Sequence, residues 1–378
     1  MGSGVRRVSL VAAAAAVLFV VAAASAWGAN SPALTFVSPS PGAGATLSSG
    51  SVSFAFTYNR KPKATQSLTC SLSGPTSSSG PCDAPVAFGS DGSRSSKSYS
   101  GLQNGSYTFT VSLTLTDGGV ASASRGFTVA VPTRHIYWTS RESNTVGRAD
   151  VGGGNVNQSF ITGASGPEGV AVDSSHVYWA NINGRTIGRA DLGGQNVSQS
   201  FITGADFPTS VAVDSGHVYW ANLSSGTIGR ADLGGQNVNQ SFITGGAFPV
   251  GVAVDAGHVY WANDGAGTIG RADLDGQNVN QSFITGIDQT EGVAVDSGHV
   301  YWTTGSGIGR ADLSGQNVNQ SFITGANGPA GVAVDSGHVY WTNSGGGTIG
   351  RADLDGQNVN QSFITGLSFP FGVAVDPG

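Results

Sequence analysis

The chain holds six histidines, and all six stand at one place in a repeated segment, directly before Val-Tyr-Trp or Ile-Tyr-Trp. They are His135, His176, His217, His258, His299 and His338. A zinc site needs several nitrogen or sulfur atoms at about 2.0–2.3 Å from one metal ion. Equivalent residues of separate repeats are held apart by the repeat itself. The pattern therefore predicts a structural role for the histidines and no metal centre.

Each repeat also carries a Gly-Arg-Ala-Asp segment, as at residues 270–273. Its Arg and Asp are two residues apart, so both project from the same face of a strand. There the Arg can reach the Asp at the end of an adjacent strand or blade. Six equivalent copies cannot supply the unlike groups that catalysis needs, so we expect a structural Arg–Asp ladder.

Two repeats contain Asp-Leu-Asp-Gly-Gln-Asn, at residues 273–278 and 353–358, which has the spacing of the first calcium ligands in an EF-hand loop. Neither copy continues with the later ligands or with the final Glu of that loop. The other repeats replace the second Asp, for example by Gly193, Gly234 or Ser314. A hairpin turn explains the pattern better than a calcium site.

The spacing of six tryptophans indicates which elements hold these residues. Trp138, Trp179, Trp220, Trp261, Trp302 and Trp341 follow one another at intervals of 41, 41, 41, 41 and 39 residues. Each interval contains four short apolar runs separated by turn residues, for example 251–255, 258–262, 268–273 and 281–286. Four short runs without helical periodicity predict a four-stranded antiparallel unit. Such units bury both faces when they form a closed β-propeller.

The first repeat begins at His135 and lacks the Gly-Val-Ala-Val-Asp strand that precedes this segment in the other copies. Residues 372–376 supply that strand, and no partner strand follows them. We expect them to pair beside residues 135–139 and complete the first blade. The predicted fold is therefore all-β, with a six-bladed propeller over residues 133–378 that is closed by the C-terminal strand.

Residues 1–29 have the order of a secretory signal peptide: two arginines, an apolar stretch over residues 8–24, and a small-residue cleavage site. We expect cleavage after Ala26 or Ala29, because the apolar run barely reaches the roughly 20 residues that span a bilayer. No membrane span is expected in the mature chain. The segment predicts a secreted, extracellular or cell-surface protein, or a periplasmic one in a Gram-negative host.

Residues 30–132 lack the repeat but have apolar residues alternating with period two over 52–58 and 107–115. About seven such strands fit a β-sandwich. The segment Tyr-Ser-Gly-Leu-Gln-Asn-Gly-Ser-Tyr-Thr-Phe-Thr-Val at residues 99–111 resembles the Ig-like or fibronectin-III-like domains of secreted bacterial proteins. We therefore expect an N-terminal Ig-like β-sandwich before the propeller.

The only two cysteines, Cys70 and Cys82, lie in this segment on either side of a loop rich in Ser, Gly and Pro. In an exported protein we expect them to form a disulfide. Closing so short a loop stabilises the folded state by about 3 kcal/mol on the chain-entropy estimate.

The chain has 17 basic and 23 acidic residues, which gives a net charge of −6. Each of the six repeats contributes two Asp and one Arg, and these alone account for the whole net charge. An acidic chain without a basic stripe argues against nucleic acid as a partner. We expect no cofactor.

The Val-Tyr-Trp-Thr-Asn, Ile-Tyr-Trp-Thr-Ser and Val-Tyr-Trp-Ala-Asn segments resemble the Tyr-Trp-Thr-Asp (YWTD) repeat of low-density-lipoprotein-receptor class B propellers. The resemblance spans residues 134–378, and it implies six blades and extracellular protein recognition. One departure is systematic, because no copy has Asp as the fourth residue. The residues found there are Ser140, Asn181, Asn222, Asn263, Thr304 and Asn343. Interactions of that carboxylate in the family therefore do not carry over.

The copies differ in two places, the stretch before each Val-Ala-Val-Asp and the turn after each Tyr-Trp. Because strands alternate in direction, both places emerge on one side, at the mouth of the central channel. Drift in relaxed loops is the alternative, but it would also vary the opposite turns, which are nearly identical. The residues expected to recognise a ligand, with the phenylalanines as an apolar rim, are Arg141, Glu142, Glu168, Arg185, Phe207, Phe248, Asp264, Glu291, Phe369 and Phe371.

The sequence thus predicts a binding or scaffold protein that uses this face to recognise an extracellular protein or glycan. The enzyme alternative rests on Glu168 and Glu291, which begin the first strands of the second and fifth blades. In gluconolactonase-like propellers such a Glu helps to bind a calcium or zinc ion, and streptogramin-lyase-like propellers resemble the Gly-Val-Ala-Val-Asp repeat. The repeats supply no unique His, Asn and Asp set to complete a metal site.

Overall fold

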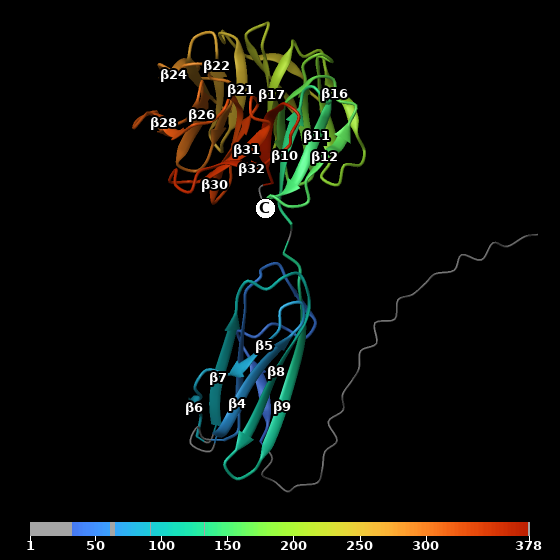
Figure 1. Cartoon of the computed structure of the whole chain (residues 1–378), viewed down its shortest axis with the longest axis vertical. Coiled ribbons are helices and arrows are strands. Elements are labelled where there is room, and N and C mark those ends of the chain that lie inside the picture. The colour runs from blue at the N-terminus through green and yellow to red at the C-terminus, as the bar shows by residue number, and fades with distance from the viewer. Residues whose placement is uncertain (1–31, 61–64, 91, 132, 377–378) are drawn as a thin grey trace, which may run out of the picture. The chain divides into compact units, whose positions relative to one another are not determined.

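The computed structural model describes residues 32–60, 65–90, 92–131 and 133–376. The chain divides into two compact units, Met1–Pro132 and Thr133–Gly378. The regular secondary structure in the described ranges is entirely β (Figure 1). No helix in these ranges is long and apolar enough to cross a membrane. The expected signal peptide, residues 1–29, lies outside the described residues.

In the described part of the first unit, nine strands form two sheets. The four-stranded sheet has the order β1-β3-β7-β6, with bounds Leu34–Val37, Val52–Tyr58, Gly92–Tyr99 and Val86–Phe88. The five-stranded sheet has the order β2-β9-β8-β4-β5, with bounds Ala45–Leu47, Val120–Val129, Gly105–Leu115, Thr65–Ser73 and Ser78–Pro81. The number exceeds the seven strands expected from the sequence, because β5 and β6 are short, exposed edge strands without apolar alternation.

The two sheets of this unit share one apolar core. Along β8, buried residues alternate with more exposed ones, as the period-two pattern predicts. Phe54 of β3 stacks on Phe109 of β8 with ring centroids 4.0 Å apart, and neither ring is exposed. The aromatic contact joins one sheet to the other.

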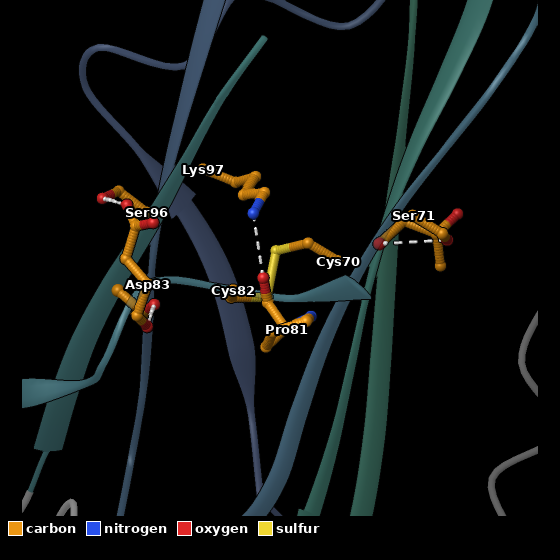
Figure 2. Close-up of a disulfide and its surroundings, with 9 residues drawn as sticks. Cys70, Ser71, Pro81, Cys82, Asp83, Ser96 and Lys97 are labelled. Carbon is orange, nitrogen blue, oxygen red and sulfur yellow. Dashed lines mark hydrogen bonds between the residues drawn. A yellow bond between two sulfur atoms is a disulfide. The ribbon is translucent and has the colours of Figure 1, made fainter. Parts of the chain in front are cut away.

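The predicted disulfide is present. Cys70 on β4 and Cys82, just after β5, are bonded, with their Cα atoms 5.1 Å apart (Figure 2). Nearby, Lys97 Nζ donates to the Pro81 carbonyl at 3.0 Å. Lys97 lies on β7 of the other sheet, so the disulfide and this hydrogen bond together hold the end of β5 against both sheets.

The second unit contains six four-stranded antiparallel sheets among its described residues, and we call each sheet a blade (Figure 1). Blade 1 has β33 (Pro370–Val375), β10 (His135–Ser140), β11 (Thr145–Asp150) and β12 (Asn157–Thr162). Blade 2 has β13–β16 with bounds Pro167–Val172, His176–Asn181, Thr186–Asp191 and Ser198–Thr203. Blade 3 has β17–β20 with bounds Pro208–Val213, His217–Asn222, Thr227–Asp232 and Asn239–Thr244.

Blade 4 has β21–β24 with bounds Pro249–Val254, His258–Asn263, Thr268–Asp273 and Asn280–Thr285. Blade 5 has β25–β28 with bounds Val293–Val295, His299–Thr304, Gly307–Asp312 and Asn319–Thr324. Blade 6 has β29–β32 with bounds Pro329–Val334, His338–Asn343, Thr348–Asp353 and Asn360–Ile364. In blade 4 the strands begin and end within two residues of the runs expected from the sequence.

A buried tryptophan fixes the second and third strands of each blade. In blade 4, Trp261 of β22 pairs with Gly270 of β23, and its side chain has no exposed surface. A Cβ on Gly270 would overlap the indole ring, so only glycine leaves room for it. The same requirement explains the Gly of each Gly-Arg-Ala-Asp segment, through the pairs Trp138–Gly147, Trp179–Gly188, Trp220–Gly229, Trp302–Gly309 and Trp341–Gly350.

The last strand pairs with the first strand of the unit. β33 runs antiparallel to β10, with Val375 opposite Ile136 and Val373 opposite Trp138. The Asp376 carboxylate accepts the His135 N–H at 2.8 Å. Arg134 donates to the Asp376 carbonyl and also pairs with the Asp335 carboxylate, 3.3 Å away. β33 therefore completes the sheet that β10 begins.

The first strands of the blades touch one another in order. At one position along them, a Cβ on any of the glycines would collide with the backbone of the next first strand. The residues at this position are Gly169, Ser210, Gly251, Gly292, Gly331 and Gly372. In blade 3 the Ser210 hydroxyl accepts the Val252 N–H instead, at 3.1 Å. The contacts return from Gly372 of β33 to Glu168 and Gly169 of β13.

Gly270→Ala is expected to destabilise the propeller by about 3 kcal/mol, because the added Cβ must push the Trp261 indole or the strand aside. Chemical unfolding followed by tryptophan fluorescence measures the change. Gly234→Ala is the matched control, because a Cβ at Gly234 meets open space. Equal unfolding free energies for the two variants would contradict the packing role of Gly270.

Candidate functional site

The two variable segments of each blade lie at the same end of the sheet. We call their surface the variable face: the turns 140–144, 181–185, 222–226, 263–267, 304–306 and 343–347, and the crossovers 166–168, 207–209, 248–250, 288–291, 328–330 and 369–371. In blade 4 the Asp264 N–H donates to the Phe248 carbonyl at 3.2 Å, and in blade 6 the Ser344 N–H donates to the Gly328 carbonyl at 3.0 Å. Turn and crossover therefore form one continuous surface in these blades.

The asparagine that replaces the aspartate of the YWTD repeat fastens the crossover to its blade. The Asn181 Nδ2 donates to Thr186 Oγ1 at 3.2 Å and to the Gln199 carbonyl at 2.9 Å, while its Oδ1 accepts the Ser165 N–H at 2.9 Å. A carboxylate could not donate the first two bonds. Equivalent bonds are made by Asn222, Asn263 and Asn343.

A left-handed backbone conformation recurs where each crossover begins. Phe207, Phe248 and Phe369 have φ of 53°, 53° and 47°, and Gln289 of blade 5 has φ of 53°, whereas Gly166 and Gly328 take this conformation in blades 2 and 6. Left-handed backbone costs a residue with a Cβ about 1–2 kcal/mol, so glycine is the more stable choice there. Phe248 and Phe369 are 60% and 42% exposed, so burial does not offset the cost.

An arginine covers one of these phenylalanines. The Arg185 guanidinium carbon, in the turn of blade 2, lies 4.1 Å from the centroid of the Phe207 ring. A cation over an aromatic face contributes about 0.5–1 kcal/mol at an exposed site. Phe207 thus has a cation of the chain itself on its ring, and the ring is only partly exposed.

A salt bridge joins blades 1 and 2 on the variable face. Arg141 Nη1, in the turn of blade 1, lies 2.9 Å from Oε1 of Glu168 on β13. Glu168 is 3% exposed, whereas the Arg141 side chain is 45% exposed. Burial raises the pKa of Glu168 to about 7, although the Arg141 charge lowers this pKa, and the Glu291 charge raises it further. A carboxyl with such a pKa changes its charge near neutral pH.

The fold does not require a carboxylate at this place. The position of Glu168 is occupied in blades 3, 4, 6 and 1 by Thr209, Val250, Ala330 and Phe371. Burying a carboxylate costs free energy that these residues avoid. Glu168 and Glu291 are therefore departures from what the propeller itself needs.

Glu291, the equivalent residue of blade 5, has a different neighbour. Its side chain is exposed. Loss of hydration and the charge of Asp264 raise the pKa of Glu291, and the Arg141 charge lowers it. Asp264 holds the third place after Trp261, the place that Arg141 holds after Trp138. One pair of positions thus carries Arg and Glu at blades 1 and 2, but Asp and Glu at blades 4 and 5.

The other expected site residues lie apart from these contacts. Glu142 is exposed in the turn after Arg141. Phe371 is partly buried, and its carbonyl accepts a hydrogen bond from the Thr342 hydroxyl. Thr342 escaped the sequence analysis, as did Thr139, whose Oγ1 accepts the Gly372 N–H at 2.8 Å. The sequence did contain a signal for these two threonines, because blades 2–4 have Ala at the equivalent place.

The expected Arg–Asp ladder is wrong in its partners. In blade 4 the Arg271 guanidinium carbon lies 4.1 Å from the centroid of the Phe283 ring, and Nη1 donates to the Leu313 carbonyl of blade 5 at 3.1 Å. Asp273 instead accepts from Asn278 Nδ2 at 2.7 Å. The Arg271 guanidinium thus contacts an aromatic ring and a backbone carbonyl of the next blade in place of the nearby carboxylate.

The residues weighed for metal binding take structural partners. Asn278 Nδ2 donates to Asp273, and Gly276 has a φ of 83°, so the Asp-Leu-Asp-Gly segment is a hairpin turn. His258 lies against two aspartates, 3.6 and 3.7 Å away. In the part of the chain that the structure describes, no group of three or more His, Cys, Asp or Glu side chains could hold a metal ion.

Glu168 is expected to make stability depend on pH. Its pKa is raised from 4.5 to about 7 in the folded chain, so folding binds a proton between these pH values and stability falls as pH rises through 7. Relative to Glu168→Gln, the wild type should lose about 3 kcal/mol between pH 4.5 and pH 8. Urea unfolding of both proteins at the two pH values measures this difference. A difference that does not change with pH would contradict the buried, ionisable Glu168.

The comparisons with known proteins agree with the fold. The family model for low-density lipoprotein receptor repeat class B matches residues 337–377. The protein is similar to a chain in the crystal structure of a nidogen/laminin complex, with 18% sequence identity and a TM-score of 0.55. The match covers 64% of this chain and 98% of that chain. No curated protein matches the chain.

Two lyases are also similar, at lower TM-scores. A streptogramin B lyase structure has 18% identity over 77% of this chain and 98% of its own, with a TM-score of 0.45. Inactive virginiamycin B lyase from Staphylococcus aureus, solved with quinupristin, has 16% identity over 63% and 88%, with a TM-score of 0.44. The family model matches one repeat, and the repeated four-stranded sheets together with the likeness to the nidogen/laminin structure indicate a β-propeller fold for the second unit.

Proposed function

We propose that this chain is a secreted recognition scaffold, which binds a partner protein with the variable face of a six-bladed propeller closed by β33. One observation carries the proposal: the blades differ at the variable face and agree at the opposite end. There, every blade repeats one turn, in which an Asn side chain donates to an Asp carboxylate at 2.7 Å. The same fold therefore permits uniform turns, and the variable face departs from them.

Residues of the variable face that lower the stability of the fold support a function there. Three phenylalanines hold a left-handed backbone that glycine holds in blades 2 and 6 and Gln289 holds in blade 5, and a buried carboxylate replaces residues such as Thr209. Strained backbone and buried charge persist where they serve recognition. Exposed aromatic side chains are also enriched at protein interfaces.

The N-terminal part supports export. Residues 1–29 are proposed to be the signal peptide, and residues 30–132 an Ig-like domain whose two sheets share an aromatic core. The Cys70–Cys82 disulfide suits an oxidising compartment outside the cytoplasm. The solved structure of the nidogen/laminin complex is of a protein assembly, which favours a protein as the partner here.

Removing the exposed rings should weaken partner binding without harming the fold. Phe248→Gly/Phe369→Gly installs the residue that blades 2 and 6 have in this conformation, so the variant should be at least as stable as the wild type. Pull-downs from the native extracellular fraction, quantified by mass spectrometry, should recover at least one protein at about tenfold lower yield with this variant.

The control variant is Val238→Ser/Val359→Ser, which removes two exposed apolar side chains outside the variable face. It should recover the partner as the wild type does. Equal recovery of all proteins by the wild type and both variants would refute binding at the variable face. Recovery that is lost after enzymatic deglycosylation of the fraction would identify a glycan as the ligand.

The enzyme alternative, a metal-dependent gluconolactonase-like hydrolase or a streptogramin-lyase-like enzyme, rests on Glu168 and Glu291. A pKa near 7 at Glu168 suits proton transfer. Elemental analysis of the purified mature protein separates the two functions. One divalent ion per chain, lost in Glu168→Gln, would favour the enzyme and count against a pure binding role.

A further inference from the structure

The variable face contains two aromatic and acidic groupings, and the first is occupied by cations of the chain itself. Arg185 lies over the Phe207 ring, and Arg141 pairs with the buried Glu168. Both arginines come from turns and reach residues in the crossover of the following blade. In blades 1–3, each aromatic or acidic group named here thus has a basic partner.

The second grouping has the same kinds of residue but no arginine at the two equivalent turn places, although the Arg141 charge also lowers the pKa of Glu291. Phe248 replaces Phe207 one blade further on, and the turn place that Arg185 holds is here Gly226. Glu291 replaces Glu168, and the turn place that Arg141 holds is here Asp264. Phe248 is accordingly 60% exposed and Glu291 is exposed.

The residues of this second grouping are neighbours. The Asp264 N–H donates to the Phe248 carbonyl at 3.2 Å, and a Cβ on the next residue, Gly265, would lie 2.6 Å from the Phe248 ring. The ring therefore lies against the turn that carries Asp264. Glu291 lies beside the first strand of blade 4, because a Cβ on Gly251 would be 2.6 Å from the Glu291 carbonyl oxygen. Asp264 and Glu291 hold the places of Arg141 and Glu168, whose side chains are 2.9 Å apart.

We propose that Phe248, Asp264 and Glu291 bind a lysine or arginine side chain of the partner protein. The cationic head lies at the two carboxylates, and its aliphatic stem lies on the Phe248 ring. The inference rests on the proposed function and deepens it, by naming the chemistry that the partner must present. The arginines of the first grouping are the internal precedent, because equivalent places there already hold basic side chains.

Charge complementarity favours a basic side chain over the other possible occupants. Two like charges side by side destabilise each other, and a cation between them removes the repulsion. An exposed aromatic ring adds attraction for a cation with an apolar stem, which a hydrated metal ion lacks. A neutral peptide would leave both carboxylates desolvated and unpaired, which disfavours its binding.

Selection from a phage-displayed library of random heptapeptides on the full mature chain tests the inference. We expect selected peptides to share a Lys or Arg at one position. A synthetic selected peptide, measured by isothermal titration calorimetry, should bind at least tenfold more tightly than its analogue with norleucine or citrulline in place of that Lys or Arg.

Asp264→Ser/Glu291→Ala should weaken the selected peptide at least tenfold. Both replacements occur naturally in blade 6, as Ser344 and Ala330, so the variant should fold. Asp264→Arg should weaken binding as strongly, because its guanidinium would occupy the site as Arg141 does. The control, Asp275→Gly/Asp355→Gly, makes the same change in net charge at the opposite turns, where Gly193 and Gly234 are the sister residues, and should bind unchanged.

Selected peptides without a common basic residue, whose binding still depends on Phe248 and Phe369, would overturn this inference and leave the proposed function standing. Binding that is unaffected by Asp264→Ser/Glu291→Ala, or that requires an added divalent ion, would also overturn it. If the wild type retains no more phage than the Phe248→Gly/Phe369→Gly variant does, the result would count against the proposed function itself.

Discussion

Close packing of the first strands against one another is the constraint on which the rest of the propeller depends. At one place in these strands a Cβ would strike the next backbone, so five of the six residues there are glycine. Because the contacts run from β13 through blades 3–6 to β33 and back to β13, the last strand has only one place to pair. In the proposed ring closed by β33, this order would set blade 1 opposite blade 4 and blade 2 opposite blade 5.

The charged residues of the variable face occupy equivalent places in different blades. Arg141 and Asp264 hold equivalent places in blades 1 and 4, as Glu168 and Glu291 do in blades 2 and 5. The Glu291 charge raises the pKa of Glu168, and the Arg141 charge lowers the pKa of both carboxyls. The frame needs none of these charges, since other blades hold Ser, Thr or Ala in their places. Their cost in stability is borne at the surface where the partner is expected to bind.

The repeat made the strands predictable, because period, turn residues and buried tryptophans are local signals. The side-chain partners were less so. Arg271 contacts the Phe283 ring and the Leu313 carbonyl and does not pair with a nearby aspartate. The Arg141–Glu168 salt bridge joins two different blades. Both outcomes depend on how neighbouring blades are placed, which no single repeat encodes. The edge strands β5 and β6 also escaped prediction, because exposed short strands carry no apolar alternation.

Hydrogen exchange of the full chain tests most directly whether the ring is closed by its last strand. β33 and its sister first strand β21 have similar lengths and pair with β10 and β22 in the same way. If β33 closes the ring, amides of the two strands should exchange equally slowly and lose protection together in denaturant. Full exchange of β33 while β21 remains protected would contradict the closed ring and the opposition of the charged blades.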